Sequence, residues 1–239
     1  MLTSVVRSGL AATFDLAARL RRGRPLHPAG LVLDARLRLH GTGREWGADF
    51  LDRRMDLAGI ARLSRSVGLP PPVPDILGIA LRWEQAAATP ELLLAGTGHT
   101  VLGRRLLRPA TAWAPGVYGS LFPYEVGGRR VLLGALPRAG RRLPARFDVL
   151  ADAVVGGPLL FDLLVAAPSG PWRVFGQVEL TGPARTDAER PTRFNPVRHP
   201  IPGLRPAGWL SDVRGAAYVG AQRVAGQPAE ERHLTSRHT

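Results

Sequence analysis

Arg214 and Tyr218 stand four residues apart in a segment near the end of the chain, Ser211–Arg223. On a helix, residues i and i+4 lie on the same face, so the guanidinium of Arg214 can reach the phenol oxygen of Tyr218. A neighbouring positive charge favours the phenolate over the phenol, and a phenolate is an oxygen ligand for iron. The pair therefore predicts an iron ligand, although an exposed helical tyrosine beside a surface arginine has the same spacing.

A second candidate for chemistry lies far upstream, in Arg24-Pro-Leu-His-Pro-Ala-Gly30. A neutral imidazole near its ordinary pKa can accept a proton and return it, which makes His27 a candidate acid and base. The alternative is a surface histidine in a proline-rich turn.

The chain contains no cysteine, which excludes disulfides, thiolate ligation of haem and cysteine-based zinc sites. An iron ion would therefore need oxygen or nitrogen ligands.

The composition indicates one domain with one core. The chain has 239 residues, of which 45% are hydrophobic, and no low-complexity linker divides it. Its formal charge is +13, yet every basic residue is arginine, and arginine is enriched together with alanine, glycine and proline. This combination points to a GC-rich coding sequence. Because no basic stripe is interleaved with aromatic residues, we expect no nucleic-acid partner.

Residues 1–23 have the pattern of an amphipathic helix that ends in a basic cluster. Charged residues interrupt the apolar run and no small-residue cleavage site follows, so a signal peptide is not indicated. No stretch is long and apolar enough to span a bilayer, and we expect a cytoplasmic protein without a stable membrane anchor. The helix would pack on the domain or at a subunit contact of a homo-oligomer. Its apolar face would carry Val6, Leu10, Phe14 and Ala17.

The elements that must position these residues are mainly strands. Gly127-Gly128 supplies the positive φ angles of a tight turn inside a hairpin over residues 121–135. The proline cluster Pro70–Pro74 predicts a loop, and helices are expected at 145–155 and 210–224. Short, turn-punctuated strands favour an antiparallel barrel or sandwich over a parallel sheet. Further strands are expected at 31–39, 61–67, 75–83, 91–95, 161–166 and 172–180.

The order of several motifs resembles the haem catalases, in the small, barrel-only form of catalase-related haem proteins. This resemblance implies an α+β fold with an antiparallel β-barrel of the haem-catalase type and flanking helices. The barrel domain would cover residues 24–225, followed by a flexible tail at 226–239. The motifs that carry the resemblance, in chain order, are Arg24-x-x-His27-x-x-Gly30, Arg62-Leu-Ser64, Asp75-x-x-Gly78-x-Ala80, Tyr118-Gly-Ser120 with Gly127-Gly128, Val174–Leu180, Phe194-Asn-Pro196 and Arg214-x-x-x-Tyr218.

The resemblance also implies roles for individual residues. Tyr218, as phenolate, would ligate ferric haem b, with Arg214 stabilising its negative charge. His27 would move a proton from the near to the far oxygen of a peroxide, and Ser64 would fix the tautomer of this histidine by a hydrogen bond. Three arginines would pair with the haem propionates, although the third lies two positions short of the family's spacing. They are Arg24, Arg62 and Arg223.

The main departure from the family is on the distal side, where catalases place an asparagine and this chain offers Gly96 or Thr97. A threonine hydroxyl still donates one hydrogen bond, so we expect a peroxidase that oxidises an organic electron donor with weak or no catalase activity. A non-catalytic haem carrier or sensor on the same fold is the alternative.

A third hypothesis, a metal-dependent hydrolase such as a phosphodiesterase, needs closely grouped ligands, whereas the histidines here are scattered. Four of the six are His27, His40, His99 and His199.

Overall fold

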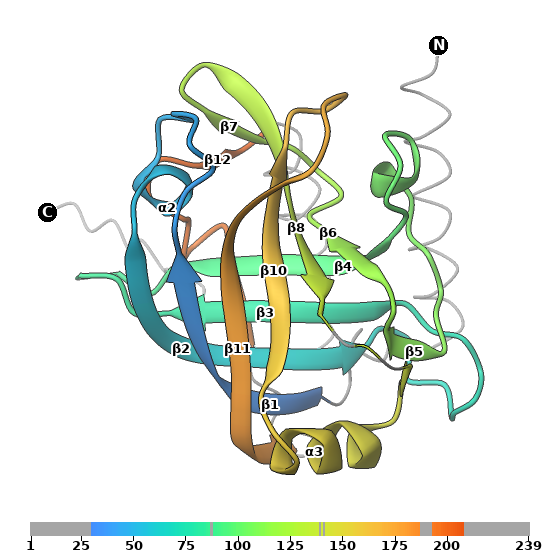
Figure 1. Cartoon of the computed structure of the whole chain (residues 1–239). Helices are drawn as coiled ribbons and strands as arrows, with labels where there is room; N and C mark the ends of the chain where they lie inside the picture. Colours follow the sequence, from blue (N-terminus) through green and yellow to red (C-terminus); the bar gives the residue numbers. More distant parts are fainter. Residues whose placement is uncertain (1–29, 87, 139, 141, 187–192, 208–239) are drawn as a thin grey trace, which may run out of the picture. The chain divides into compact units, whose positions relative to one another are not determined.

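Eight antiparallel strands close into a barrel, because β8 pairs with β10 as well as with β6 (Figure 1). This computed structural model describes residues 30–207, apart from 87, 139, 141 and 187–192. The strands, in their order around the barrel, are β10 (Leu159–Ala166), β11 (Arg173–Thr186), β1 (Gly30–Leu39), β2 (Met55–Arg65), β3 (Leu77–Trp83), β4 (Glu91–Thr97), β6 (Val117–Gly119) and β8 (Arg129–Pro137).

Smaller elements extend and close the barrel. The short helix α2 brings Phe50 into the core, where its ring stacks on Trp83 with 4.9 Å between the centroids. The longer helix α3 buries Leu150 and Val154 and lies at the foot of the barrel in Figure 1. The bounds of these elements are α2 (Asp49–Asp52), a 3₁₀ turn η1 (Gly103–Arg105), β5 (Ala112–Ala114), β7 (Tyr124–Val126), β9 (Leu143–Pro144), α3 (Phe147–Val155) and β12 (Arg205–Pro206).

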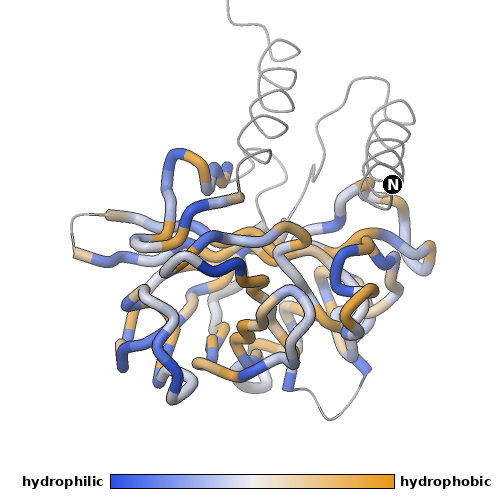
Figure 2. Tube along the Cα trace, turned by 90° about the horizontal axis from the view of Figure 1, so that it is seen from above, coloured by the Kyte–Doolittle hydropathy of each residue, from blue (hydrophilic) through white to orange (hydrophobic). Residues whose placement is uncertain are grey.

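The interior of the barrel is filled by the side chains that alternate inward along each strand, as a two-residue period requires. On β2, for example, Ala61 and Leu63 belong to the core cluster, whereas Arg62 between them faces outward. Figure 2 shows the resulting alternation of hydrophobic and hydrophilic residues along the chain. The core is therefore a packed interior and holds large side chains such as Trp83, Trp113 and Phe175.

The expected barrel fold is confirmed. A strand is present at each predicted position and the helix predicted at 145–155 covers Phe147–Val155, although β11 continues to Thr186, six residues beyond its predicted end. The hairpin turn at Gly127 and Gly128 has φ angles of +51° and +71°, as a tight turn of this kind needs. The strand expected at 61–67 begins earlier, at Met55. Gly59 interrupts the sequence pattern there, and a Cβ atom at this position would lie 2.1 Å from the carbonyl oxygen of Arg82.

Several expectations fall outside the described residues. They concern the N-terminal helix at 1–23, the helix at 210–224 and the tail at 226–239. The boundaries of a barrel domain at residues 24 and 225 likewise stay predictions. Within the described part of the chain, no helix is both long and apolar enough to cross a membrane.

Candidate functional site

Five small residues form a continuous row across the outer face of the barrel, which we call the outer row. Strand pairing fixes it, since residues directly opposite each other in antiparallel strands point to the same side of a sheet. Neighbouring strands lie about 4.8 Å apart, so the row spans roughly 19 Å. Its members, from β1 to β6, are Gly30, Ser64, Gly78, Ala95 and Gly119.

The outer row is nearly flat because only a serine and an alanine contribute side chains to it. It is also screened from solvent: Ser64 is 5% exposed, the three glycines are buried and Ala95 is half-buried. An outer barrel face open to water would normally carry long polar side chains. This face is therefore suited to contact with a flat apolar surface rather than with water.

Arg62 borders the outer row. It lies two residues before Ser64 on the same face of β2 and is only 5% exposed. A Cβ atom added to Gly30 would lie 2.7 Å from Cζ of Arg62, so the guanidinium passes close over the backbone of β1. The glycine at position 30 makes this approach sterically feasible. The result is a buried positive charge at the edge of a flat surface, where it can pair with an anionic group.

Thr97 extends the same face by one step along β4. Its side chain is buried, at 2% exposure, and its Oγ1 atom has no hydrogen-bond partner among the described residues. A Cβ atom at Gly119 would lie 2.9 Å from this oxygen, which places the hydroxyl beside the end of the outer row. Leaving a buried hydroxyl unpaired costs free energy, so such groups commonly serve a ligand, a water or a strained site.

The strand register decides between Gly96 and Thr97. Gly96 pairs with Tyr118, whose ring lies in the barrel core, so position 96 faces inward. Thr97 faces outward together with Ala95 and Ser64. A side chain that acts beside the outer row on β4 can therefore come from residue 95 or 97, whereas position 96 faces the core.

Both described tyrosines belong to the barrel core. Tyr118 donates a hydrogen bond of 2.8 Å from its hydroxyl to the carbonyl oxygen of Trp113, and its ring meets Phe161 edge to face. Burial raises the pKa of the Tyr118 phenol well above its ordinary value, so this phenol stays protonated. Tyr124 is 5% exposed and lies in the same core. The chain has three tyrosines, so only Tyr218 is left as a phenolate candidate outside the core.

The structure brings three of the predicted site residues, Arg62, Ser64 and Thr97, onto one face of the barrel. The remaining predicted residues lie outside the described part of the chain: Arg24, His27, Arg214, Tyr218 and Arg223. Within the described part, no group of three or more His, Asp or Glu side chains is placed to hold a metal ion.

Sequence reasoning missed the small residues at positions 95 and 119 as parts of the site. A signal existed, because Gly78 and Gly119 both fall inside motifs that the sequence singles out. Their alignment in one row depends on strand register, which periodicity within a single strand does not specify.

A solved structure resembles this arrangement of strands. A fungal catalase superposes with a TM-score of 0.58 at 10% sequence identity, over 82% of this chain and 58% of the catalase chain. The barrel has a catalase-like fold. No protein-family model matches the sequence, and no curated protein matches it. The likeness concerns the fold alone, and this chain spans little more than half the length of that catalase.

The catalase-like barrel therefore presents a flat, buried surface on its outer wall with one guanidinium at its edge and two hydroxyls. A guanidinium can pair with a carboxylate or phosphate, and hydroxyls can donate or accept single hydrogen bonds. None of these three side chains is itself a strong nucleophile or general base at neutral pH. Any redox or acid–base chemistry at this face requires further groups.

Proposed function

We propose that this protein binds haem b against the outer row and uses it to reduce hydrogen peroxide or an organic hydroperoxide, with an organic electron donor as the second substrate. One observation carries the proposal: the catalase-like barrel has a flat, buried outer row bordered by the buried Arg62.

The described residues fit a haem. A planar macrocycle needs a surface without protruding side chains, and the outer row spans roughly 19 Å of backbone with no side chain larger than serine. A propionate needs a cationic partner, and Arg62 supplies a guanidinium at 5% exposure. The unpartnered Oγ1 of Thr97 supplies a donor for a small polar ligand on the same face.

Tyr218 is the proposed iron ligand, with Arg214 as the group that favours its phenolate. The position of the other two tyrosines in the barrel core supports this assignment by elimination. A protonated phenol in the core, such as Tyr118, cannot serve an outer-face site. Arg24 and Arg223 are proposed as further propionate partners.

His27 is the proposed proton carrier. His27 precedes Gly30 by three positions, and at about 3.5 Å per residue the linking chain can span at most roughly 11 Å from the start of the outer row. Gly30 pairs directly with Ser64 on β2. This proximity supports the proposed hydrogen bond from Ser64 to the imidazole, which would fix its tautomer.

Bound haem would supply the redox-active iron at which the O–O bond of a peroxide is cleaved. The protein's own contribution is to hold a proton on His27, pass it to the departing oxygen, and exclude bulk water with the apolar wall of the outer row. Thr97 would position the peroxide with one hydrogen bond. Because no amide side chain joins it on the outer face of β4, we propose donor oxidation in preference to peroxide dismutation.

Haem titration of the purified protein tests binding. We expect a Soret band that saturates at one haem per chain, and a protein that gives no Soret band after expression with haem or after titration contradicts the proposal. Stopped-flow mixing of the haem-loaded protein with hydrogen peroxide and a phenolic donor then tests the activity. Donor oxidation is expected; haem binding without any reaction would identify a haem carrier or sensor instead.

A further inference from the structure

The outer row continues one strand further, onto β8. Gly119 pairs directly with Gly134, which lies between two residues of the core cluster and therefore faces outward. Around Gly134 the outward-facing side chains of β8 and β10 are apolar and buried, although such positions are usually polar where a barrel wall faces water. They are Leu132, Leu164 and Ala166. The row thus has an apolar end at β8, whereas Arg62 gives it a cationic end at β2.

Trp172 covers the apolar end of the row. A Cβ atom at Gly134 would lie 3.2 Å from Cη2 and 3.4 Å from Cζ3 of Trp172, so the indole ring lies against the backbone of β8. The same Cβ atom would lie 2.9 Å from the carbonyl oxygen of Tyr118, and glycine is therefore the residue that fits at position 134. Because Trp172 is only half-buried, part of its ring is left for contact with a ligand.

Two loops hold the indole in this position. Its Nε1 donates a hydrogen bond to the carbonyl oxygen of His99 at 3.3 Å, and the guanidinium carbon of Arg104 lies 4.6 Å from the ring centre. Arg104 is itself buried and donates to the carbonyl oxygens of Ala167 at 3.4 Å and Gly170 at 3.0 Å. These contacts fix the ring before a ligand arrives, which lowers the entropy cost of binding against it.

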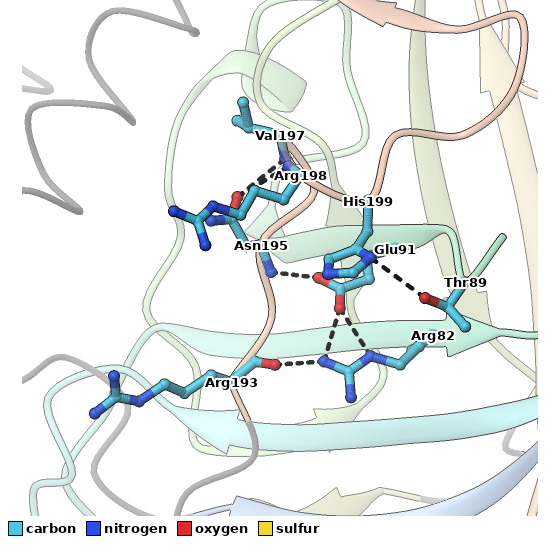
Figure 3. Close-up of polar contacts among 8 residues, drawn as sticks. All are labelled: Arg82, Thr89, Glu91, Arg193, Asn195, Val197, Arg198 and His199. Carbon is cyan, nitrogen blue, oxygen red and sulfur yellow. Dashed lines mark hydrogen bonds and ion pairs between the residues drawn. The ribbon is translucent and has the colours of Figure 1, made fainter.

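On β3 and β4 the outer face is covered two same-face steps away from the row. Arg82 and Glu91 stand directly opposite each other there, and both Nε and Nη2 of Arg82 lie 2.7 Å from Oε1 of Glu91. The other carboxylate oxygen of Glu91 accepts the backbone N–H of Asn195, and Arg82 also donates to the carbonyl oxygen of Arg193 (Figure 3). Residues 193–199 therefore limit the flat surface along the strands, and its two ends limit it across them.

The two ends of this surface differ in chemistry, and so do two edges of haem b. Arg62 on β2 and Gly134 on β8 are separated by four strand spacings of about 4.8 Å each, or roughly 19 Å along the barrel wall. One edge of haem b carries two propionates, and the opposite edge carries methyl and vinyl groups. A guanidinium pairs with carboxylates, whereas an indole gains free energy from contact with apolar groups. The surface therefore matches haem b in one direction, with the propionates toward Arg62.

We propose that Trp172 is a haem-contact residue: it packs against the vinyl-bearing edge of haem b and, together with Arg62, fixes the direction in which the haem lies along the outer row. This inference rests on the proposed haem site and names the residue that sets the orientation of the haem there. Burial of one vinyl group against the ring removes two carbon atoms from water, which corresponds to roughly tenfold in affinity.

The test combines two haems with two variants of the haem-free protein. Deuterohaem carries hydrogen atoms in place of the two vinyl groups of haem b and keeps the iron and both propionates. Trp172→Ala removes the proposed contact, and Arg62→Ala is the matched control because it acts on the opposite edge of the same ligand. Trp172 precedes β11 in a loop and is half-buried, so the variant is expected to fold, which the thermal midpoint of the haem-free protein checks. Affinities are measured by titration at the Soret band.

We expect the wild-type protein to bind haem b about fivefold more tightly than deuterohaem. Trp172→Ala should weaken the binding of haem b on the order of tenfold and that of deuterohaem only about twofold, so that the preference disappears. Arg62→Ala should weaken the binding of both haems by the same factor, because both carry the propionates. Trp172→Leu, which keeps an apolar side chain, should retain part of the preference.

A Trp172→Ala variant that binds both haems as the wild type does, or that loses the same factor for both, would overturn the contact with the vinyl-bearing edge. In either case the Soret band of the wild-type protein shows that the haem site itself stands. If the wild-type protein gives no Soret band with either haem, the proposed function fails and this inference fails with it.

Discussion

Along β1 and β2, the outer face of the barrel has an exposed half around Arg36 and a buried half around Arg62. Arg36 and Arg62 both point outward from neighbouring strands, yet the Arg36 side chain is 59% exposed and Arg62 is 5% exposed. Arg36 forms a bidentate ion pair with Asp56, with both nitrogen–oxygen distances at 2.7 Å. A surface depression of about 410 Å³ lies beside this pair, and Arg36 and Asp56 form part of its lining.

The contrast shows what distinguishes a solvated barrel wall from a wall built for contact. The inner faces of both halves follow the same apolar alternation, so packing of the core does not explain the difference. The exposed half carries long charged side chains, as an antiparallel sheet facing water does. The buried half replaces them with glycine, alanine and serine, which leave the surface flat and suited to a flat ligand.

Filling the outer row should have the largest effect. In Ala95→Phe, a ring would stand above the flat surface, and we expect haem affinity to fall on the order of 100-fold or more because a planar ligand and the new side chain would overlap. The matched change on the exposed half, Ala58→Phe, should leave affinity unchanged. Titration followed at the Soret band measures both, and equal affinities in the two variants would remove the outer row from the site.

Removing the buried guanidinium should have the next largest effect. We expect Arg62→Ala to weaken haem binding by at least about tenfold, because a propionate would lose a charge-assisted partner in a site screened from water. Arg36→Ala, on the exposed half, should not change haem affinity, since its pair with Asp56 is open to solvent and salt. If both arginine variants bind haem like the wild type, Arg62 has no role as a propionate partner.

Removing the unpartnered hydroxyl of Thr97 should affect activity more than stability. Thr97→Val keeps the shape and removes an unpaired buried oxygen, so the thermal midpoint should stay the same or rise slightly, while the rate with peroxide falls about fivefold. Thr42→Val is the control, since Oγ1 of Thr42 accepts from Nε1 of Trp46 at 3.0 Å and its loss should cost about 1 kcal/mol. Calorimetry measures the effect on stability, and stopped-flow kinetics measure the effect on activity. Lower stability with normal kinetics in Thr97→Val would contradict the proposed role of Thr97 in positioning the peroxide.

Most of the barrel could be predicted from sequence because its strands show clear alternation and glycine-rich turns. The short strands β5, β6, β9 and β12 could not, since two or three residues give no measurable period. The start of β2 at Met55 was missed because Gly59 interrupts its pattern. A glycine is needed there because a Cβ atom at position 59 would lie 2.1 Å from the carbonyl oxygen of Arg82 on β3, and sequence alone does not show that contact.

The candidate site could be predicted only in part. Arg62 and Ser64 were identified through a motif, and the structure places both on the outer face of β2. The choice between Gly96 and Thr97 could not be made from sequence, because it depends on which face of β4 points outward. The structure joins Glu91 to Asn195, whose N–H donates to Oε2 of Glu91; the two residues are 104 positions apart, and no local pattern connects them.

The smallest expected effect concerns the exposed ion pair. Hydrogen bonds from Arg36 lower the pKa of Asp56 below its ordinary value of 3.8, so the pair contributes stability above that pH and loses it as the pH falls through the lowered pKa. Asp56→Asn should therefore reduce the thermal midpoint only slightly at pH 7 in low salt, and not at all below the lowered pKa of Asp56 or in high salt. A large decrease in the thermal midpoint at pH 7 would show that the exposed ion pair contributes more to stability than a solvated surface pair does.

The absorption spectrum of haem-loaded Tyr218→Phe, compared with that of Tyr118→Phe, tests the account most directly. Both variants lose one phenol oxygen, but Tyr118 lies in the barrel core and should affect only stability, by about 1 kcal/mol for its hydrogen bond to Trp113. We expect the tyrosinate charge-transfer band to disappear and the Soret band to shift or vanish in Tyr218→Phe, with both bands unchanged in Tyr118→Phe. An unaltered spectrum in Tyr218→Phe would contradict the proposed ligand and the site built around it.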